Sequence, residues 1–229
     1  MEITNDPVHG TSEKDQIPGE QVGGKSVNSV LKQATKYRST ITSASLMVPE
    51  SRTIARLLLK DGGSDWRIHI VVNNVLQIRS SRAALSIAQV LRARLRLMGP
   101  ELLDMVISGT RDTATHACFA AAIKHSALLG DYLDLVLREK YRLFVPKLRP
   151  SDWSRYIDDC RARDPEMAVW TESTVLRLRW VVHDMLAEMG YIDSTRSLRL
   201  QSVRVVPDVL RYLEKEREHY VLKCITVCP

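Results

Sequence analysis

The sequence predicts a mainly helical, all-α protein, and three observations support this. From Pro49 onward, apolar residues recur at spacings of three and four, as on the buried face of a helix. Proline, glycine and small hydroxyl residues stand where these helices should begin and end. Only two phenylalanines and few β-branched runs occur among the 229 residues, which argues against a large sheet. We therefore expect helices packed on helices.

The first ordered part is expected to be a helical bundle over residues 37–146. A flexible extension over residues 1–36 should precede it, because that segment is rich in Gly, Ser, Asn, Asp and Lys and can bury little apolar surface. Helices are expected over residues 49–60, 65–73, 80–98, 100–108, 110–126 and 128–143. The second of these runs through Ile68, Val71 and Val72. Short turns join them, as is typical of a compact bundle.

The remaining residues, 147–229, favour a winged helix-turn-helix-like domain. We place the boundary between Pro146 and Pro150. A short helix from Ser151 and a long helix from Thr171 to Gly190 are followed by residues 196–206, which alternate apolar and polar as in a β-hairpin. A closing helix begins at residue 207.

This interpretation assigns four candidate residues to DNA binding. Ser173 and Arg177 would face outward on the recognition helix, and Arg199 and Arg204 would lie on the wing. The alternative is a small packing domain that binds another protein. Both remain open, because the local net charge of this part is close to zero.

The charge distribution carries the main functional signal. The formal net charge of +6 lies in residues 46–99, which hold nine basic and three acidic side chains. No acidic residue occurs between Asp65 and Glu101. That stretch contains Arg67, Arg79, Arg82, Arg92, Arg94 and Arg96. A positive field this local indicates a polyanionic partner.

Helical phasing places most of these arginines on one side of the helix expected over residues 80–98. Its apolar residues form one stripe, Ala84, Ile87, Ala88, Leu91, Leu95 and Met98. Arg82, Arg92 and Arg96 gather on the opposite side with Arg79 at the cap turn, and Arg94 lies at one flank. An ordinary solvated face usually mixes charges of both signs in i,i+4 pairs. The pattern therefore favours contacts to phosphates over a solvated face.

A nucleotide-binding motif match is interpreted as coincidence. Gly19 to Ser26 satisfy GxxxxGK[ST], the pattern of a phosphate-binding P-loop. Such a loop requires a buried strand before it, and the preceding residues are polar and end in Pro18. We expect neither a nucleotide nor another cofactor.

Enzymatic and membrane functions are not expected either. His69, His116, His125 and His183 have no ligand partner four residues later in the chain, so no metal site is expected. No GxSxG or HExxH motif occurs. The four cysteines form no CxxC pair, no apolar run could span a bilayer, and the N-terminus has no export signal. We expect a non-enzymatic, cytoplasmic protein without membrane insertion and without a small-molecule substrate.

Several sequence landmarks resemble the BrxA family of the BREX bacteriophage-exclusion systems. Residues 42–59, TSASLMVPESRTIARLLL, look like the opening signature of that family. Later landmarks follow in order: RSSR at 79–82, PELL at 100–103, VLREK at 136–140 and WTEST at 170–174. The resemblance covers about residues 38–215 and leaves out the N-terminal extension.

This resemblance implies a fold, a ligand and a setting. It implies an N-terminal body similar to the antitermination factor NusB, joined to a helix-turn-helix-like C-terminal part. It also implies binding to double-stranded DNA and a place in phage defence beside other BREX proteins. The main alternative is an adaptor that assembles the defence complex without significant DNA affinity. RNA binding of the NusB type is a weaker option, because few aromatic residues cluster for base stacking.

Overall fold

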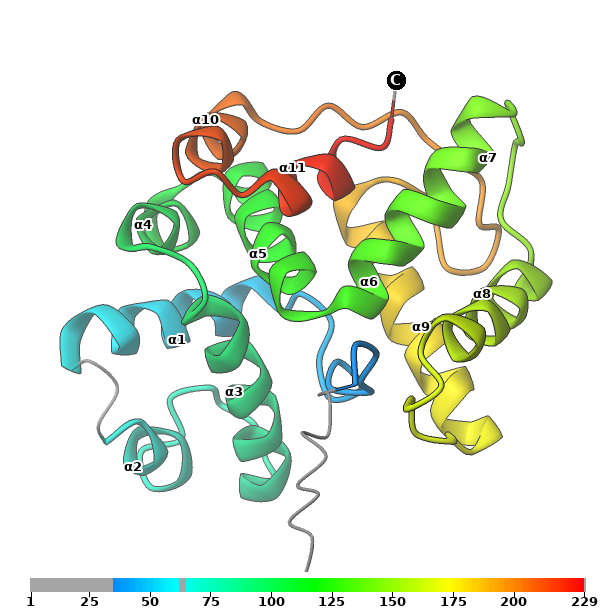
Figure 1. Cartoon of the computed structure of the whole chain (residues 1–229). Coiled ribbons are helices and arrows are strands. Elements are labelled where there is room, and N and C mark those ends of the chain that lie inside the picture. Colours follow the sequence, from blue (N-terminus) through cyan, green and yellow to red (C-terminus); the bar gives the residue numbers. More distant parts are fainter. Residues whose placement is uncertain (1–34, 62–64, 229) are drawn as a thin grey trace, which may run out of the picture. The chain divides into compact units, whose positions relative to one another are not determined.

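The computed structural model describes residues 35–61 and 65–228. These residues belong to one compact unit, and the unit is built from helices (Figure 1). Within the described ranges there is no sheet. The two β-bridges, Lys147 with Arg199 and Ile192 with Leu200, are isolated. The predicted mainly α class is therefore confirmed.

Many of the helices follow one another with short connections, whereas residues 190–206 form a long connection between α9 and α10. In chain order they are α1 (Val48–Asp61), α2 (Trp66–Val71), α3 (Ser81–Leu95), α4 (Pro100–Ser108), α5 (Arg111–His125), α6 (Ala127–Asp131), η1 (Tyr132–Leu137), α7 (Arg138–Arg142), α8 (Pro150–Arg163), α9 (Glu172–Met189), α10 (Pro207–Lys215) and α11 (His219–Ile225). The π-helical turn η1 joins α6 to α7 without a break (Figure 1). One helix was predicted there.

Hydroxyl side chains cap the starts of four of the described helices. Each side chain accepts a hydrogen bond from the backbone N–H three residues later: Ser80 before α3, Thr110 before α5, Ser126 before α6 and Thr171 before α9. Gly190 ends α9 with φ 82°, a left-handed conformation that suits glycine. These caps lie where the sequence predicted helix ends.

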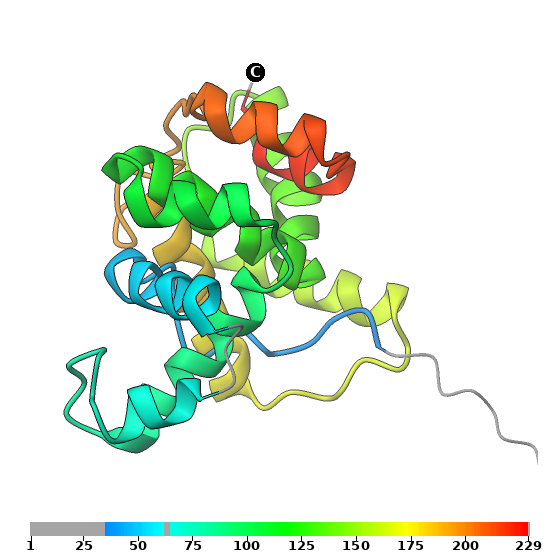
Figure 2. The same cartoon turned by 90° about the vertical axis from the view of Figure 1, so that its left-hand side faces the viewer.

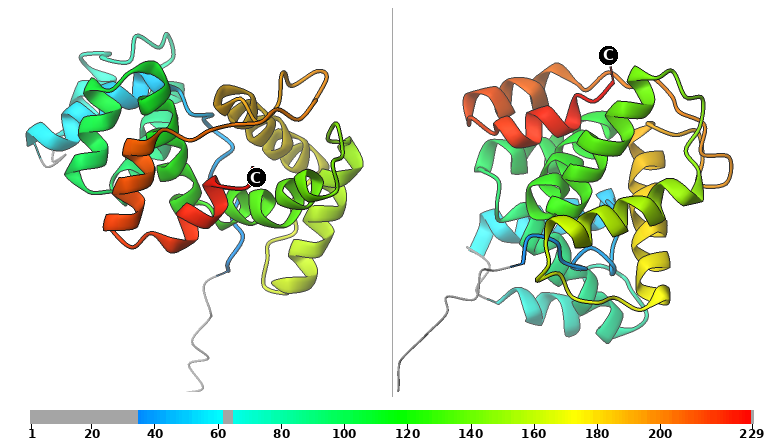
Figure 3. Two further views of the ribbon diagram at one scale, coloured as in Figure 1. Left: turned by 90° about the horizontal axis from the view of Figure 1, so that it is seen from above. Right: turned by 45° about the vertical axis from the view of Figure 1, so that its right-hand side comes forward.

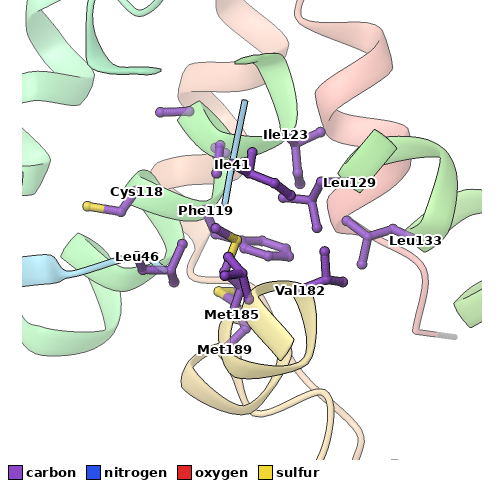
Figure 4. Close-up of a cluster of buried hydrophobic side chains, with 14 of the residues drawn as sticks. Ile41, Leu46, Cys118, Phe119, Ile123, Leu129, Leu133, Val182, Met185 and Met189 are labelled. Carbon is purple, nitrogen blue, oxygen red and sulfur yellow. The ribbon is translucent and has the colours of Figure 1, made fainter. Parts of the chain in front are cut away.

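The buried core is organised around α5. Residues 114–123 of this alanine-rich helix are all buried, and α5 packs against α1, α3, α4, α6, α9, α10 and α11. Figure 4 shows Phe119 of α5 surrounded by residues from distant segments, among them Ile41, Leu133 and Met185. Seen from above, α10 and α11 lie beside α5 (Figure 3). The predicted division between Pro146 and Pro150 stays a prediction.

The β-hairpin predicted over residues 196–206 is wrong. Leu200 N–H donates to Pro146 O at 3.0 Å, and Gln201 N–H donates to Tyr191 O at 2.9 Å, so this backbone bonds to neighbouring loops. Residues 201–206 are extended and belong to no strand. The alternation arises because Leu198 and Val205 are buried individually. Period-two burial occurs here without a ladder of strand hydrogen bonds.

A buried aromatic cluster contains an unusual histidine. His183 of α9 lies beside Tyr132 and Trp153, with ring centroids 6.4 Å away in both pairs. In the described part of the chain, His183 Nε2 and the Tyr132 hydroxyl are buried without a hydrogen-bond partner. Burial, and secondly the charge of Arg179, lowers the pKa of His183 to about 4.

This histidine should make the protein acid-sensitive. Because the folded pKa lies below that of an unfolded histidine, near 6.5, the unfolded chain binds more protons between these values. Stability should fall as the pH drops from about 6.5 to about 4, by on the order of 3 kcal/mol from this group. We expect His183→Phe to flatten that dependence in urea unfolding, while the exposed His219→Phe leaves it unchanged. Identical pH profiles for wild type and His183→Phe would contradict this expectation.

Candidate nucleic-acid interface

Arginines from α2 and α3 meet around Trp66. The short helix α2 packs on α3 (Figure 1). The guanidinium groups of Arg67 and Arg92 lie 5.4 and 5.2 Å from the centroid of the Trp66 ring. These are cation–π distances, so the ring holds both positive charges close together. Trp66 thereby connects the arginines of the two helices.

We use the name basic face for Arg67, Arg79, Arg82, Arg92 and Arg96. Four of these side chains are exposed and Arg92 is half-buried. The pKa of Arg92 is lowered, first by burial and then by the positive charges of Arg96 and Arg67. Like charges therefore repel one another within the basic face.

The exposed arginines of this face are not neutralised by the surrounding protein. Among the described residues, the ion pairs are formed elsewhere and include none to Arg67, Arg79, Arg82 or Arg96. The sequence pattern predicted this, because residues 66–100 contain no acidic side chain. Four guanidinium groups thus remain available to an external anion.

The helix dipole distinguishes the two ends of the basic face. Arg92 and Arg96 lie at the C-terminal end of α3, where positive charge stabilises a helix. Arg79 and Arg82 lie at its N-terminal end, where each costs about 0.3–1 kcal/mol, and no acidic residue occurs in the first turn. Helix stability can therefore explain the positions of Arg92 and Arg96, but not those of Arg79 and Arg82. A phosphate bound at this end would relieve the repulsion.

Arg94 does not belong to this face, although the sequence analysis included it among the candidates. It is 2% exposed, and its guanidinium donates to Ser45 O at 2.5 Å and to Ala44 O at 2.8 Å. Burial lowers its pKa to about 10. Its position at the flank of the apolar stripe was the one sign in the sequence that it could be buried. Arg94 holds the backbone of Ala44 and Ser45 and, being buried, cannot contact DNA in this fold.

That segment, residues 39–46, connects α3 to α9, and we call it the bridging segment. Ser86 Oγ of α3 donates to Ser43 Oγ at 3.0 Å. From α9, Arg177 Nε donates to Thr42 O at 3.1 Å. The N-terminal ends of α3 and α9 consequently lie at the same end of the unit (Figures 1 and 2). This arrangement brings two predicted contact regions near one another.

The candidates on α9 are exposed but partly engaged. The Ser173 hydroxyl lies 3.0 Å from the Thr171 hydroxyl. The Arg177 guanidinium lies 4.7 Å from the centroid of the half-exposed Trp180 ring, in addition to its bond to the bridging segment. Both side chains therefore hold local structure, and Arg177 also contacts the bridging segment.

The candidates on the predicted wing lie elsewhere. Arg199 and Arg204 are exposed, but they follow the C-terminal end of α9, whereas Ser173 lies in its first turn. An 18-residue helix is about 27 Å long. The structure thus separates the predicted recognition-helix residues from the predicted wing residues.

One feature of this region was missed by sequence reasoning. Ile68, Val71 and Val72, through which the sequence predicted a helix, are exposed by 54%, 43% and 73%. Their surface adjoins Arg67. No property of the sequence alone distinguishes an exposed apolar face of a short helix from a buried one.

The described ranges contain neither a metal-binding cluster nor a membrane-spanning helix. No cluster of three or more His, Cys, Asp or Glu side chains is placed to hold a metal ion there. No helix in this part of the chain has the length and apolar content needed to cross a membrane. The P-loop-like match over residues 19–26 lies outside the described residues, as does almost all of the predicted flexible extension.

Fold and surface together define a mainly helical protein with a local basic face, whose exposed arginines have no ion-pair partner among the described residues. Comparison with known proteins gives a match to the BrxA family over residues 35–217. The chain belongs to the BrxA family, and it is therefore a component of a BREX phage-defence system. The match begins where the described residues begin.

Relatives and a solved structure agree with this assignment. The BREX protein BrxA of Paramagnetospirillum magneticum AMB-1 is 48% identical over 193 residues, covering 84% of this chain and 97% of that protein. The BREX protein BrxA of Escherichia coli O9:H4 HS is 28% identical, covering 82% and 88%. A crystal structure of an uncharacterized protein from Magnetospirillum magneticum superposes with a TM-score of 0.79 at 47% identity, covering 84% of this chain and 99% of that one.

Proposed function

We propose that this protein is a non-enzymatic accessory component of the defence system that binds double-stranded DNA. The observation that carries the proposal is the set of four exposed arginines on the basic face, to which no described residue supplies an ion pair. Arginine binds phosphate oxygens through paired N–H donors. Displacing counterions from these phosphates drives binding to any sequence.

The proposed contact region has a centre and a border. The centre is the basic face on α2 and α3. Ser173 and Arg177 lie in the first part of α9, where Arg177 contacts the bridging segment, and they would add contacts to the backbone of the same duplex. Arg199 and Arg204, which lie beyond the other end of α9, would contribute only as a separate contact with a longer duplex. Phosphate contacts of this kind position a protein on DNA without specifying a sequence.

A salt titration tests the proposal. Four arginine–phosphate contacts should give a log–log slope of affinity against salt of about −4, since each neutralised phosphate contributes about −0.9. The measurement is fluorescence anisotropy of the full chain with a labelled 20-base-pair duplex between about 50 and 200 mM salt. A slope near zero, or a dissociation constant above about 10⁻⁴ M at physiological salt, would contradict the proposal that the protein binds DNA.

An adaptor role is the second candidate, and exposed apolar side chains favour it. Phe144 is 91% exposed, Val169 93% and Trp180 50%. Exposed aromatic residues are common at the centres of protein interfaces. Binding to other BREX proteins that survives nuclease treatment would support an adaptor. Equal competition by RNA and DNA of the same length would instead support binding to either nucleic acid.

A further inference from the structure

The outer face of α2 combines apolar side chains with positive charge. At 100° per residue, Arg67, Ile68, Val71 and Val72 fall on one side of the helix, while Ile70 turns inward and is buried. The three apolar side chains are 43–73% exposed. An exposed apolar group rimmed by polar residues marks an interaction surface. The partner of this surface must accept apolar and cationic groups together.

The turn that follows α2 is held in one conformation. Asn74 and Gln77 have φ values of 44° and 54°, in the left-handed region that Gln rarely adopts. Asn74 Oδ1 accepts a hydrogen bond from Ile78 N–H at 3.1 Å, and Gln77 N–H donates to Asn74 O at 2.8 Å. Strained residues of this kind concentrate at binding sites. The turn leaves Asn73 and Gln77 exposed immediately before Arg79.

These groups suit a groove of duplex DNA better than its phosphate backbone. Apolar side chains gain little beside hydrated phosphates but can stack into the apolar interior of the base pairs. Proteins that bind the minor groove combine arginine, asparagine and glutamine at the base edges with an apolar wedge that partly unstacks a base step. Residues 67–79 supply each of these groups in one short segment, which includes Arg67 and Arg79 of the basic face.

We propose that α2 and the turn over residues 72–79 enter the minor groove and insert Ile68 and Val72 at a base step, bending the duplex. The inference rests on the proposed function, because the basic face must first hold the DNA. Trp66, whose ring lies within cation–π distance of Arg67 and Arg92, holds the start of α2 against α3. Bending should favour flexible pyrimidine–purine steps, and the narrow groove of A·T pairs should attract Arg67 and Arg79.

The test measures bending and affinity separately. End-to-end energy transfer in a doubly labelled 25-base-pair duplex with a central TA step should show shortening when the wild-type protein binds. Ile68→Ser with Val72→Ser should abolish the shortening and weaken binding about tenfold, while the salt slope stays unchanged. Both sites are exposed, so the variant should fold. Phe144→Ser with Val169→Ser, which removes two still more exposed apolar groups elsewhere, is the matched control and should behave as wild type.

A base substitution identifies the groove. Inosine·cytosine pairs resemble A·T in the minor groove and lack only the amino group that G·C presents there. Central A·T and inosine·cytosine sites should therefore bind equally and more tightly than G·C sites.

Three outcomes overturn the wedge while leaving the proposed function intact. The first is salt-dependent binding without bending, and the second is bending that persists in the serine double variant. The third is inosine·cytosine behaving as G·C, which would indicate contacts outside the minor groove. If the wild type shows no salt-dependent duplex binding, the proposed function fails and the wedge fails with it.

Discussion

Arg82→Glu combined with Arg96→Glu is expected to weaken duplex binding about 10²- to 10³-fold near 100 mM salt. Each reversal replaces an attraction to phosphate by repulsion, and like charges brought together cost several kcal/mol. A loss of about 3–4 kcal/mol corresponds to this range. The salt slope should also become shallower by about 2, since two phosphate contacts disappear. Anisotropy titrations at several salt concentrations measure both effects.

A charge-matched control distinguishes the basic face from overall charge. Arg142→Glu with Arg211→Glu changes the net charge by the same amount, at two side chains that are each 74% exposed and ion-paired elsewhere on the unit. This variant should lose little affinity, because long-range attraction is screened beyond about 10 Å at 0.1 M salt. If it binds as weakly as the basic-face variant, the protein attracts DNA by net charge alone and the basic face has no special role.

The basic face itself could be predicted from sequence because two independent patterns agreed. Charge counts located the positive excess in residues 46–99, and helical phasing placed Arg82, Arg92 and Arg96 opposite the apolar stripe. The convergence of Arg67 with Arg92 could not be predicted, since it depends on α2 packing against α3 around Trp66. Tertiary packing between separate helices leaves no trace in the periodicity of either one.

The wrong hairpin and the unpredicted exposure on α2 have a common physical origin: a local pattern does not determine which elements cover a side chain. Residues 196–206 alternate because individual side chains are buried against neighbouring elements, while their backbone bonds to loops instead of forming a hairpin. The helix through Ile68, Val71 and Val72 was predicted, but their exposure was not, because it depends on α3 being the main described element that packs against α2.

Arg94 shows where helical phasing fails to predict whether a side chain is buried. It sits at the edge of the stripe, where a rotation of a few tens of degrees decides between solvent and core. The carbonyls of Ala44 and Ser45 decide the outcome, because they offer two acceptors to the buried guanidinium. These acceptors come from the bridging segment, 49 and 50 residues away in the chain.

Arg94→Ala is expected to lower the free energy of unfolding by about 3–5 kcal/mol, because it leaves two backbone carbonyls without their donor and opens a cavity. Arg94→Lys should recover only part of this loss, since an ammonium cannot reproduce the paired guanidinium geometry. Arg96→Ala, two residues along the same helix, should change stability by less than about 0.5 kcal/mol and yet weaken DNA binding. Urea unfolding and DNA anisotropy on the three variants separate the two roles.

Unchanged stability in Arg94→Ala would contradict the structural role of Arg94. Stability loss in Arg96→Ala as large as that in Arg94→Ala would mean that α3 uses its arginines for folding on both faces, and the basic face would lose its distinct function.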